Sequence, residues 1–400
     1  MLTMIHSNSA RVEGGLFRVD RKFHVGMLQY ASAVDVPLVT VHPESVAGRD
    51  AIDTIEVPCN ELPYRVLTIK VDANRRPVED QKHLLEQQIA QSDLVYGSGM
   101  GSSAMARFHR VPYILIHEYD LQTQIVVAST QVSSVLRQVI RALKVTWKYA
   151  TETLPDARRA QSIHCNGYPI HDELCWVNDE RLLYLDSRMS ADMVISRDAL
   201  TQRLSSRRGR RLRLLYSGRY ERLKGAVDAV KVAIAATSRG LDVEMHCYGA
   251  GGEGSAMKRL VQQASMDGRI WIHDPVTYPE LVELSRGFDV FVCCHVQGDP
   301  SCTYLESFGA GLPIVGYGNR MWRRLSEHSG AGRWSPLKRP ERVVDELQRV
   351  ISDDALLESM SWKAREFALT HSFEREYELR TAALNKALRA TAPGTAKRHV

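Results

Sequence analysis

The chain has 400 residues, of which 44% are hydrophobic and 25% are charged, and its formal net charge is +5. This length and composition indicate a folded protein of two domains and exclude a disordered chain. No apolar run approaches the roughly 20 residues that cross a bilayer, and the opening "MLTMI" is too short for a secretory signal.

The cysteines predict a protein of the cytoplasm. Their number, seven, is odd, and Cys293 and Cys294 are adjacent within an apolar run. This pattern indicates buried, reduced thiols rather than a disulfide framework. No pair of cysteine or histidine residues has the spacing of a zinc site, so we expect no metal.

The first half of the chain predicts strands with helices between them. The expected strands are 2–6, 36–41, 66–69, 93–96, 112–117 and 192–195. The arginine-rich stretch 203–211 that follows is the natural domain boundary.

The second half alternates more regularly between the two kinds of element. Expected strands are 212–216, 243–248, 269–273, 289–294 and "PIVGY", and expected helices are 226–238, 255–265, one after Pro279, 301–310, 340–351, 354–369 and 373–390. Strands that alternate with helices at this spacing predict a parallel sheet covered on both faces. We therefore expect an α/β fold of two doubly wound domains that bind a ligand in the cleft between them.

Two basic segments have more than one interpretation. The stretch 203–213 holds six arginines in eleven residues, and 136–149 is basic with apolar residues at helical spacing. They could be a solvated linker and an ordinary amphipathic helix, or a surface that rests on an anionic membrane. A nucleic-acid partner is not expected, because no helix-turn-helix, zinc finger or aromatic-rich RNA-binding strand accompanies them.

The stretch "SGRYERLKG" (217–225) places two cations where a strand gives way to a helix. Arg219 offers a planar fork of donors and Lys224 a compact charge, close to a helix N-terminus at Gly225. Together they predict an anion site at the carboxyl edge of the sheet. The alternative is a pair of solvated residues in a polar loop.

The next loop, "YGAGGEG", contains the spacing G-x-G-x-x-G at Gly249, Gly251 and Gly254. A strand before it and a helix after it are the context of a dinucleotide-binding site, which would indicate an oxidoreductase. No acidic residue ends the following strand, however, and the loop belongs to the second unit of its domain. A simple glycine turn is an equally good interpretation.

The third loop is "QGDPSCTYLESFGAGLP" (297–313). Asp299 is expected to cap a helix that begins at Pro300, so that amide groups of Ser301, Cys302 and Thr303 face the cleft. Glu306 lies one turn further on, where its carboxylate can accept hydrogen bonds from a vicinal diol such as ribose. The alternative for Glu306 is an exposed helical acid.

In this order, the three loops and the "VTYPEL" segment resemble glycosyltransferase family four over roughly 211–375. The resemblance implies the GT-B fold, with a last helix that crosses back to the first domain. It implies that Arg219 and Lys224 hold the donor diphosphate and that Glu306 holds the ribose. Its other donor contacts would be the Gly249 turn, the backbone near Val276, and amide groups of Ser301, Cys302 and Thr303.

The first half resembles the family more loosely. "VEGGLFR" is similar to its first loop, where Gly14 and Gly15 let the backbone approach the donor, and "PYILIHEYD" to the strand whose last histidine, here His117, lies beside the reacting sugar. The chain also departs from the family. Gly298 stands where a glutamate usually contacts the donor sugar, and Asp299 or Gln297 would take its place.

The resemblance implies that the protein transfers a sugar, with retention of configuration, from a nucleotide diphosphate sugar to a hydroxyl acceptor. We expect no metal or cofactor, a glycan or lipid-linked glycan as acceptor, and a role in bacterial polysaccharide or glycolipid synthesis. The expected place is the cytoplasm, including the inner face of the plasma membrane. Alternatives are an NAD(P)-dependent oxidoreductase and a catalytically silent nucleotide-sugar-binding subunit.

The expected domains are an acceptor-side domain (1–205), a nucleotide-sugar-binding domain (206–372), and a crossover helix with its tail (373–400). The first two are each expected to be Rossmann-like. The catalytic candidates are His117, Arg219 and Lys224.

Overall fold

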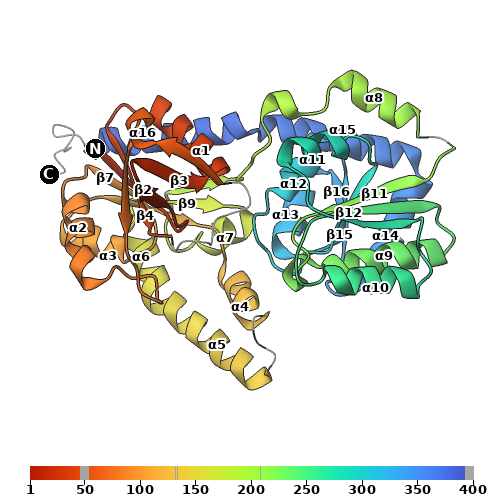
Figure 1. Ribbon diagram of the computed structural model, residues 1–400, viewed down its shortest axis with the longest axis horizontal. Coiled ribbons are helices and arrows are strands. Elements are labelled where there is room, and N and C mark those ends of the chain that lie inside the picture. Colours follow the sequence, from red (N-terminus) through yellow and green to blue (C-terminus); the bar gives the residue numbers. More distant parts are fainter. Residues whose placement is uncertain (46–53, 131, 133, 208, 392–400) are drawn as a thin grey trace.

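A computed structural model describes residues 1–45, 54–130, 132, 134–207 and 209–391, and shows two α/β bodies side by side (Figure 1). Each body is built around one parallel sheet. The confirmed prediction is the general one, an α/β fold with two doubly wound sheets.

The first sheet has seven strands in the order β10-β9-β8-β7-β1-β4-β6. Every neighbouring pair in it is parallel. Its strands are β1 (Leu2–Ile5), β4 (Leu38–Pro43), β6 (Arg65–Ile69), β7 (Leu94–Gly97), β8 (Tyr113–His117), β9 (Ser162–Asn166) and β10 (Arg181–Tyr184). Beside it lies a small antiparallel sheet of β2 (Arg11–Glu13), β3 (Leu16–Asp20) and β5 (Thr54–Pro58).

Five of the six strands predicted for the first half are present, and the one at 192–195 is wrong. Ala191–Met193 forms a single turn of 3-10 helix there. Val194 and Ile195 are buried against the second domain, so their apolar character serves packing rather than a strand. The helices of this half are α1 (Arg21–Ala33), α2 (Glu79–Ala90), α3 (Ser102–Phe108), α4 (Leu121–Thr130), α5 (Val135–Lys148), α6 (Leu154–Arg159), α7 (Tyr168–Glu173) and α8 (Arg197–Ser205).

The second sheet has six parallel strands in the order β13-β12-β11-β14-β15-β16. They are β11 (Leu212–Ser217), β12 (Val243–Tyr248), β13 (Ile270–His273), β14 (Val290–Cys293), β15 (Ile314–Tyr317) and β16 (Gly332–Ser335). Side chains alternate between the two faces, so Leu214 and Tyr216 join one apolar cluster while Leu215 joins the other.

Helices cover both faces of this sheet. They are α9 (Ala226–Ser238), α10 (Gly254–Gln263), α11 (Tyr278–Ser285), α12 (Thr303–Gly309), α13 (Arg320–Ser329), α14 (Pro340–Ser352) and α15 (Asp354–Thr370). The helix α13 and the strand β16 were not predicted.

The last helix, α16 (Phe373–Thr391), runs back to the first domain (Figure 1). Its buried residues Phe373, Tyr377 and Leu384 share an apolar cluster with Leu2 and Met4 of β1. The crossover implied by the family resemblance is thereby confirmed.

The chain passes between the domains twice, and the two passages are bonded to each other. The Leu185 amide donates to the Glu376 carboxylate at 2.9 Å, and the Phe373 amide donates to the Met189 carbonyl at 2.8 Å. The residues after Leu185 already pack against the second sheet. The domain limit at residue 205 stays a prediction.

Most of the arginine-rich stretch is occupied by structural contacts. Arg203 is buried and donates to the carbonyl oxygens of Ala310 and Gly311, both at 2.7 Å. Arg210 makes a two-pronged ion pair with Asp289 at 2.7 and 2.9 Å. Arg208 lies outside the described residues. These contacts favour a structural role for the stretch over a nucleic-acid surface.

Candidate functional site

The loops that follow β11, β12 and β14 meet at the carboxyl edge of the second sheet. The first two pack so closely that a Cβ on Gly249 would overlap the Gly218 carbonyl oxygen, and one on Gly251 would overlap the Tyr220 carbonyl. Both glycines also have positive φ, 157° and 151°. The glycine pattern therefore holds the Gly249 loop against "SGRYERLKG".

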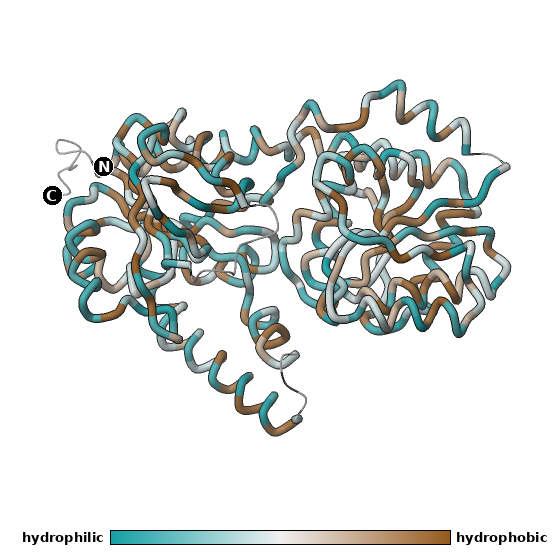
Figure 2. The backbone as a smooth tube through the Cα atoms, in the orientation of Figure 1, coloured by the Kyte–Doolittle hydropathy of each residue, from teal (hydrophilic) through white to brown (hydrophobic). Residues whose placement is uncertain are grey.

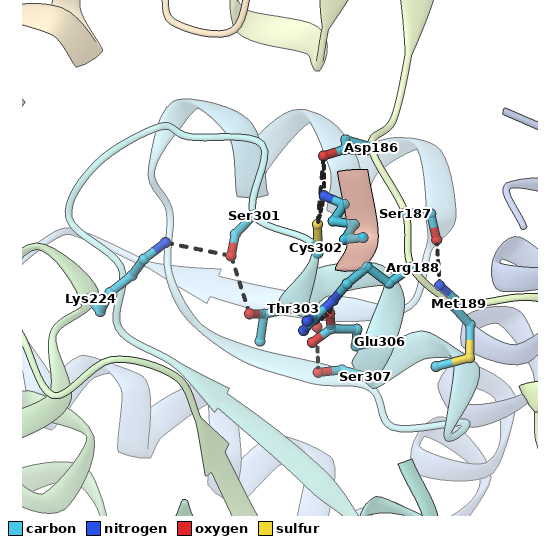
Figure 3. Close-up of polar contacts among 11 residues, drawn as sticks. Asp186, Ser187, Arg188, Met189, Lys224, Ser301, Cys302, Thr303, Glu306 and Ser307 are labelled. Atoms are coloured by element: carbon cyan, nitrogen blue, oxygen red, sulfur yellow. Dashed lines mark hydrogen bonds and ion pairs between the residues drawn. The ribbon is translucent and has the colours of Figure 1, made fainter. Parts of the chain in front are cut away.

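The buried Lys224 points toward Ser301 in this edge, and Thr303 lies beyond Ser301 (Figure 3). Its Nζ lies 2.7 Å from Asp299 Oδ2 and 3.5 Å from Ser301 Oγ, which in turn lies 3.2 Å from Thr303 Oγ1. The side chains of Lys224 and Asp299 are only 10% and 11% exposed. A buried ammonium with two hydroxyl groups beside it has the composition of an anion site.

Arg219 lies in the same loop as Lys224, and its side chain is 65% exposed. It pairs with Glu221 at 3.1 Å. Its charge reaches the buried His295, whose pKa falls to about 3, first through burial and then through Lys224 and Arg219, although Asp299 opposes them. Both cations predicted from "SGRYERLKG" therefore lower the pKa of His295.

Asp299 does not cap a helix, so that prediction is wrong. Helix α12 begins at Thr303 with Cys302 at its N-cap, and the Ser301 amide is used by a hydrogen bond to the Asp299 carbonyl at 2.9 Å. The carboxylate of Asp299 instead turns to Lys224, and its Oδ1 is buried without a hydrogen-bond partner among the described residues.

Glu306 is buried one turn into α12 and is held by an arginine that the sequence did not single out. Arg188 donates two hydrogen bonds to the same oxygen, Oε1, at 2.8 and 2.6 Å (Figure 3). The Arg188 guanidinium also lies over the Tyr278 ring, 4.2 Å from its centre. Glu306 is therefore no exposed helical acid.

A second unpredicted cation joins the domains. Lys22, from the start of α1, pairs with Asp186 and lies 3.1 Å from Cys302 Sγ. Burial alone would lower the pKa of Lys22, but Cys302 and Asp186 outweigh it and raise the pKa. Burial also raises the pKa of the Cys302 thiol, to about 11. Cys302 therefore touches the first domain through its side chain.

Three candidates, Gly14, Gly15 and His117, belong to the first domain. Gly14 and Gly15 form the turn between β2 and β3, where both have positive φ and an added Cβ would meet nothing within 4 Å. His117 ends β8, and burial lowers its pKa to about 4, so its imidazole is neutral at pH 7. Among the described residues, no hydrogen bond or ion pair joins these three to Lys224 or Glu306.

Two further candidates lie at the rim of the site. Val276 is half-buried in the loop between β13 and α11, directly before the Thr277 capping box. Gly298 faces the first domain, because a Cβ there would lie 3.0 Å from Thr123 Oγ1 and 3.4 Å from Arg320 Cβ. Arg320 pairs with the buried Asp120 at 2.5 Å. This loop is therefore part of the contact between the domains.

Stability is expected to fall between pH 7 and pH 5. Burial lowers the pKa of His42 to about 4 and of His164 and His295 to about 3. The unfolded chain binds a proton at each near pH 6.5 and the folded chain does not, so stability is full above that pH and lost below it. Urea unfolding should show a loss on the order of 1–2 kcal/mol per histidine at pH 5.

The control for this pH effect is the exposed His83. Replacing His83 by glutamine should leave the pH dependence unchanged, whereas His295→Asn should reduce it. Equal unfolding free energies at pH 7 and pH 5 in the original chain would contradict the buried neutral state of these rings.

Comparison with known families shows which proteins the residues at this edge of the second sheet resemble. Residues 201–367 match the family of Glycosyl transferases group 1. The match covers less than half of the chain. The matched residues contain Arg219, Lys224 and Glu306, so the glycosyl transferase interpretation of the Gly249 loop is favoured over a dinucleotide site. Assignment to family four stays a prediction.

The curated relatives to which the chain is similar are named glycosyltransferases. A D-inositol 3-phosphate glycosyltransferase of Arthrobacter sp. (strain FB24) is 35% identical over 106 residues, or 26% of this chain. The match spans about a quarter of that relative's length, 25%.

Solved structures show that the whole chain has the GT-B fold. HepE of Anabaena, in complex with UDP, aligns with a TM-score of 0.63 at 13% identity over 98% of this chain and 99% of HepE. WaaG, a glycosyltransferase involved in lipopolysaccharide biosynthesis, aligns with a TM-score of 0.59 at 12% identity over 96% and 99% of the two chains.

The described residues lack two kinds of feature, a membrane-spanning helix and a metal-ligand cluster. Within 1–45, 54–130, 132, 134–207 and 209–391, no helix is long and apolar enough to cross a membrane. The same residues contain no group of three or more His, Cys, Asp or Glu side chains placed to hold a metal ion. The expectation that no metal takes part stays a prediction.

Proposed function

We propose that the protein transfers a sugar, with retention, from a nucleotide diphosphate sugar to a hydroxyl acceptor. The observation that carries the proposal is the buried Lys224 with the half-buried hydroxyl groups of Ser301 and Thr303, one turn before the buried Glu306, in the part of the chain that matches a glycosyl transferase family. HepE, of the same fold, was solved with UDP and with UDP-glucose.

In the proposed complex, the donor diphosphate replaces Asp299 as the partner of Lys224. Arg219 supplies a second cation from the mouth of the site, and the Ser301 and Thr303 hydroxyl groups donate to phosphate oxygens. These donors are in place before the reaction, so they stabilise charge that develops on the leaving phosphate at little cost in reorganisation.

Glu306 is proposed to hold the ribose of the donor. Both hydrogen bonds from Arg188 go to Oε1. The other carboxylate oxygen, Oε2, then accepts from a ribose hydroxyl. Arg188 fixes the carboxylate for this task, and Tyr278 fixes Arg188.

Retention is proposed to proceed by attack on the same face of the sugar as the leaving group. The departing phosphate accepts the proton of the acceptor hydroxyl, so no protein base is needed. The neutral His117 donates or accepts a hydrogen bond to position the donor sugar, with Gly14 and Gly15 close to it. Asp299 takes the place of the missing glutamate once Lys224 has turned to the phosphate.

A panel of nucleotide sugars with a panel of glycan acceptors tests this proposal. We expect saturable binding of one nucleotide sugar, release of its nucleoside diphosphate, and a product whose anomeric configuration by NMR equals that of the donor. Binding of NAD(P) without nucleotide sugars would overturn the proposal. Donor binding without turnover on any acceptor would indicate a silent subunit, and an inverted product would overturn retention alone.

We further propose that the acceptor is a membrane glycolipid or lipid-linked glycan, met at the cytoplasmic face of an anionic membrane. Helix α5 supports this, because it projects from the first domain with apolar residues exposed along it (Figures 1 and 2). Leu136, Leu143 and Trp147 are 70%, 64% and 67% exposed. Cations at 137, 141, 144 and 148 flank them, and no acidic residue occurs from 121 to 151.

Charge complementarity makes an anionic bilayer the proposed partner of α5. In a sedimentation assay, the protein should bind vesicles that contain anionic lipid and leave neutral vesicles unbound. Leu143→Ser with Trp147→Ser should lower vesicle binding about tenfold or more, since two exposed apolar side chains would no longer enter the interface. Phe108→Ser, at an exposed site on α3, is the matched control. Equal binding to neutral and anionic vesicles would contradict the proposal.

A further inference from the structure

We propose that a cavity in the first domain binds an anionic group, phosphate or carboxylate, of the acceptor through Arg380. The identification of the bound molecule as the acceptor rests on the proposed function, but binding of an anion in the cavity can be tested without it. Arg380 belongs to the crossover helix α16, outside the residues that match the family.

The cavity has a volume of about 460 Å³, enough for a sugar ring. It lies beside the carboxyl ends of β1, β7 and β8, and His117, Lys22, Asp186 and Arg380 line it. Lys22 also contacts Cys302, the residue between Ser301 and Thr303. A molecule in the cavity would therefore lie next to the proposed donor site.

Arg380 is a buried cation with unused hydrogen-bonding capacity. The residue is only 6% exposed, and its Nη2 is buried with no hydrogen-bond partner in the part of the chain that the structure describes. Its Nε donates to the Glu376 carbonyl oxygen at 3.1 Å. Among the described residues, no ion pair joins Arg380 to a carboxylate.

Aromatic rings surround the guanidinium in place of a carboxylate. Its Cζ lies 4.0, 4.6 and 5.6 Å from the ring centres of Tyr377, Tyr184 and Tyr30. Such contacts stabilise a cation and fix the plane of its fork, but they leave its net charge uncompensated. Three carboxylates line the same cavity, those of Asp20, Glu118 and Asp186, and Asp186 Oδ2 already pairs with Lys22.

A buried charge without a counter-ion costs free energy, and a bound anion would remove that cost. The guanidinium fork matches the oxygens of a phosphate or carboxylate in both geometry and charge. The His6 side chain supplies a further polar atom for the sugar, because its Nε2 is buried without a partner and His6 lines the cavity.

The test is calorimetric binding of glucose 6-phosphate, glucuronate and glucose to the whole chain without a donor. Glucose 6-phosphate or glucuronate should bind about tenfold or more tightly than glucose, as expected for a charge-assisted hydrogen bond. Which of the two binds better identifies the anion as phosphate or carboxylate. Equal binding of all three, or none, would overturn the proposal.

Variants separate Arg380 from the donor site and from folding. Arg380→Met should abolish the preference for the anionic sugar, and Arg380→Lys should reduce it. Arg375→Met, exposed on the same helix, should keep it. If Arg380→Met fails to fold by circular dichroism, Arg380→Lys decides, and an undiminished preference in it would overturn the role of Arg380.

Lys224→Met should also keep the preference, since Lys224 lies outside the cavity. Loss of the preference in Lys224→Met would place the anion in the donor site and overturn the proposal. Failure of sugar transfer with all donors, together with Arg380-dependent binding, would reject the proposed function and leave this site intact.

Discussion

Replacing Lys224 by methionine is expected to lower turnover of the nucleotide sugar about 10²–10³-fold, because the cation that stabilises the leaving phosphate is lost. The substitution also leaves the Asp299 carboxylate buried without its partner, which costs roughly 3–5 kcal/mol of stability. Turnover should be measured as release of nucleoside diphosphate, and stability by urea unfolding.

A double variant separates the two effects of Lys224. Adding Asp299→Asn removes the unpaired charge, so Lys224→Met with Asp299→Asn should recover most of the lost stability. It should not recover turnover, since the cation is still absent. Lys231→Met, on the exposed side of α9, is the matched control and should change neither quantity. Turnover that recovers together with stability would remove Lys224 from the chemistry.

Glu306→Gln is expected to raise the KM for the donor about 10–100-fold while kcat changes little. The amide cannot accept from a ribose hydroxyl and from Arg188 with the strength of a carboxylate, and hydrogen bonds to charged groups contribute about 1.5–3 kcal/mol. Ribose does not react, so the loss should fall on binding of donor and transition state alike.

Two comparisons make the Glu306 experiment specific. Donors that lack the 2′- or the 3′-hydroxyl should bind the original chain more weakly than the full donor does. For the hydroxyl that contacts Glu306, this difference should disappear in Glu306→Gln, which should bind the deoxy donor and the full donor equally. Glu327→Gln, an exposed acid on α13, serves as the control. An unchanged KM in Glu306→Gln would show that the ribose lies elsewhere.

Much of the second domain could be predicted from the sequence, because its elements are regular and its loops carry the chemistry. The helix 226–238 and the strand 243–248 have the bounds that the periodicity predicts. Arg219 and Lys224 lie at the strand–helix junction where the sequence puts them. Each of these features depends on neighbours in the chain.

What the sequence could not predict depends on contacts between distant segments. Arg188 meets Glu306 across 118 positions, and Lys22 meets Cys302 across 280. Nothing in "DSRMS" or "DRKFHV" marks these cations as different from solvated ones. The one available signal was position in the chain. Arg188 comes shortly before the second domain, and Lys22 comes shortly after the glycine turn.

Asp299 shows a different limit. A residue before Pro300 satisfies every local rule for a helix cap, yet a buried lysine 75 positions away takes the carboxylate instead. The charge-assisted bond to Lys224 is stronger than a cap and also compensates the buried ammonium. Local preference therefore gives way to long-range electrostatics at the site itself.

The two bonded passages between the domains have a consequence for how the cleft opens. A single connecting segment would let one domain twist against the other as well as bend toward it. Here the segment after Leu185 and the start of α16 are hydrogen-bonded side by side, so twisting one against the other would break the bonds at Met189 and Glu376. Such a double hinge leaves one easy motion, a clamshell opening about its own line. That opening motion would separate Lys22 from Cys302, and the closing motion would restore the same contact between them.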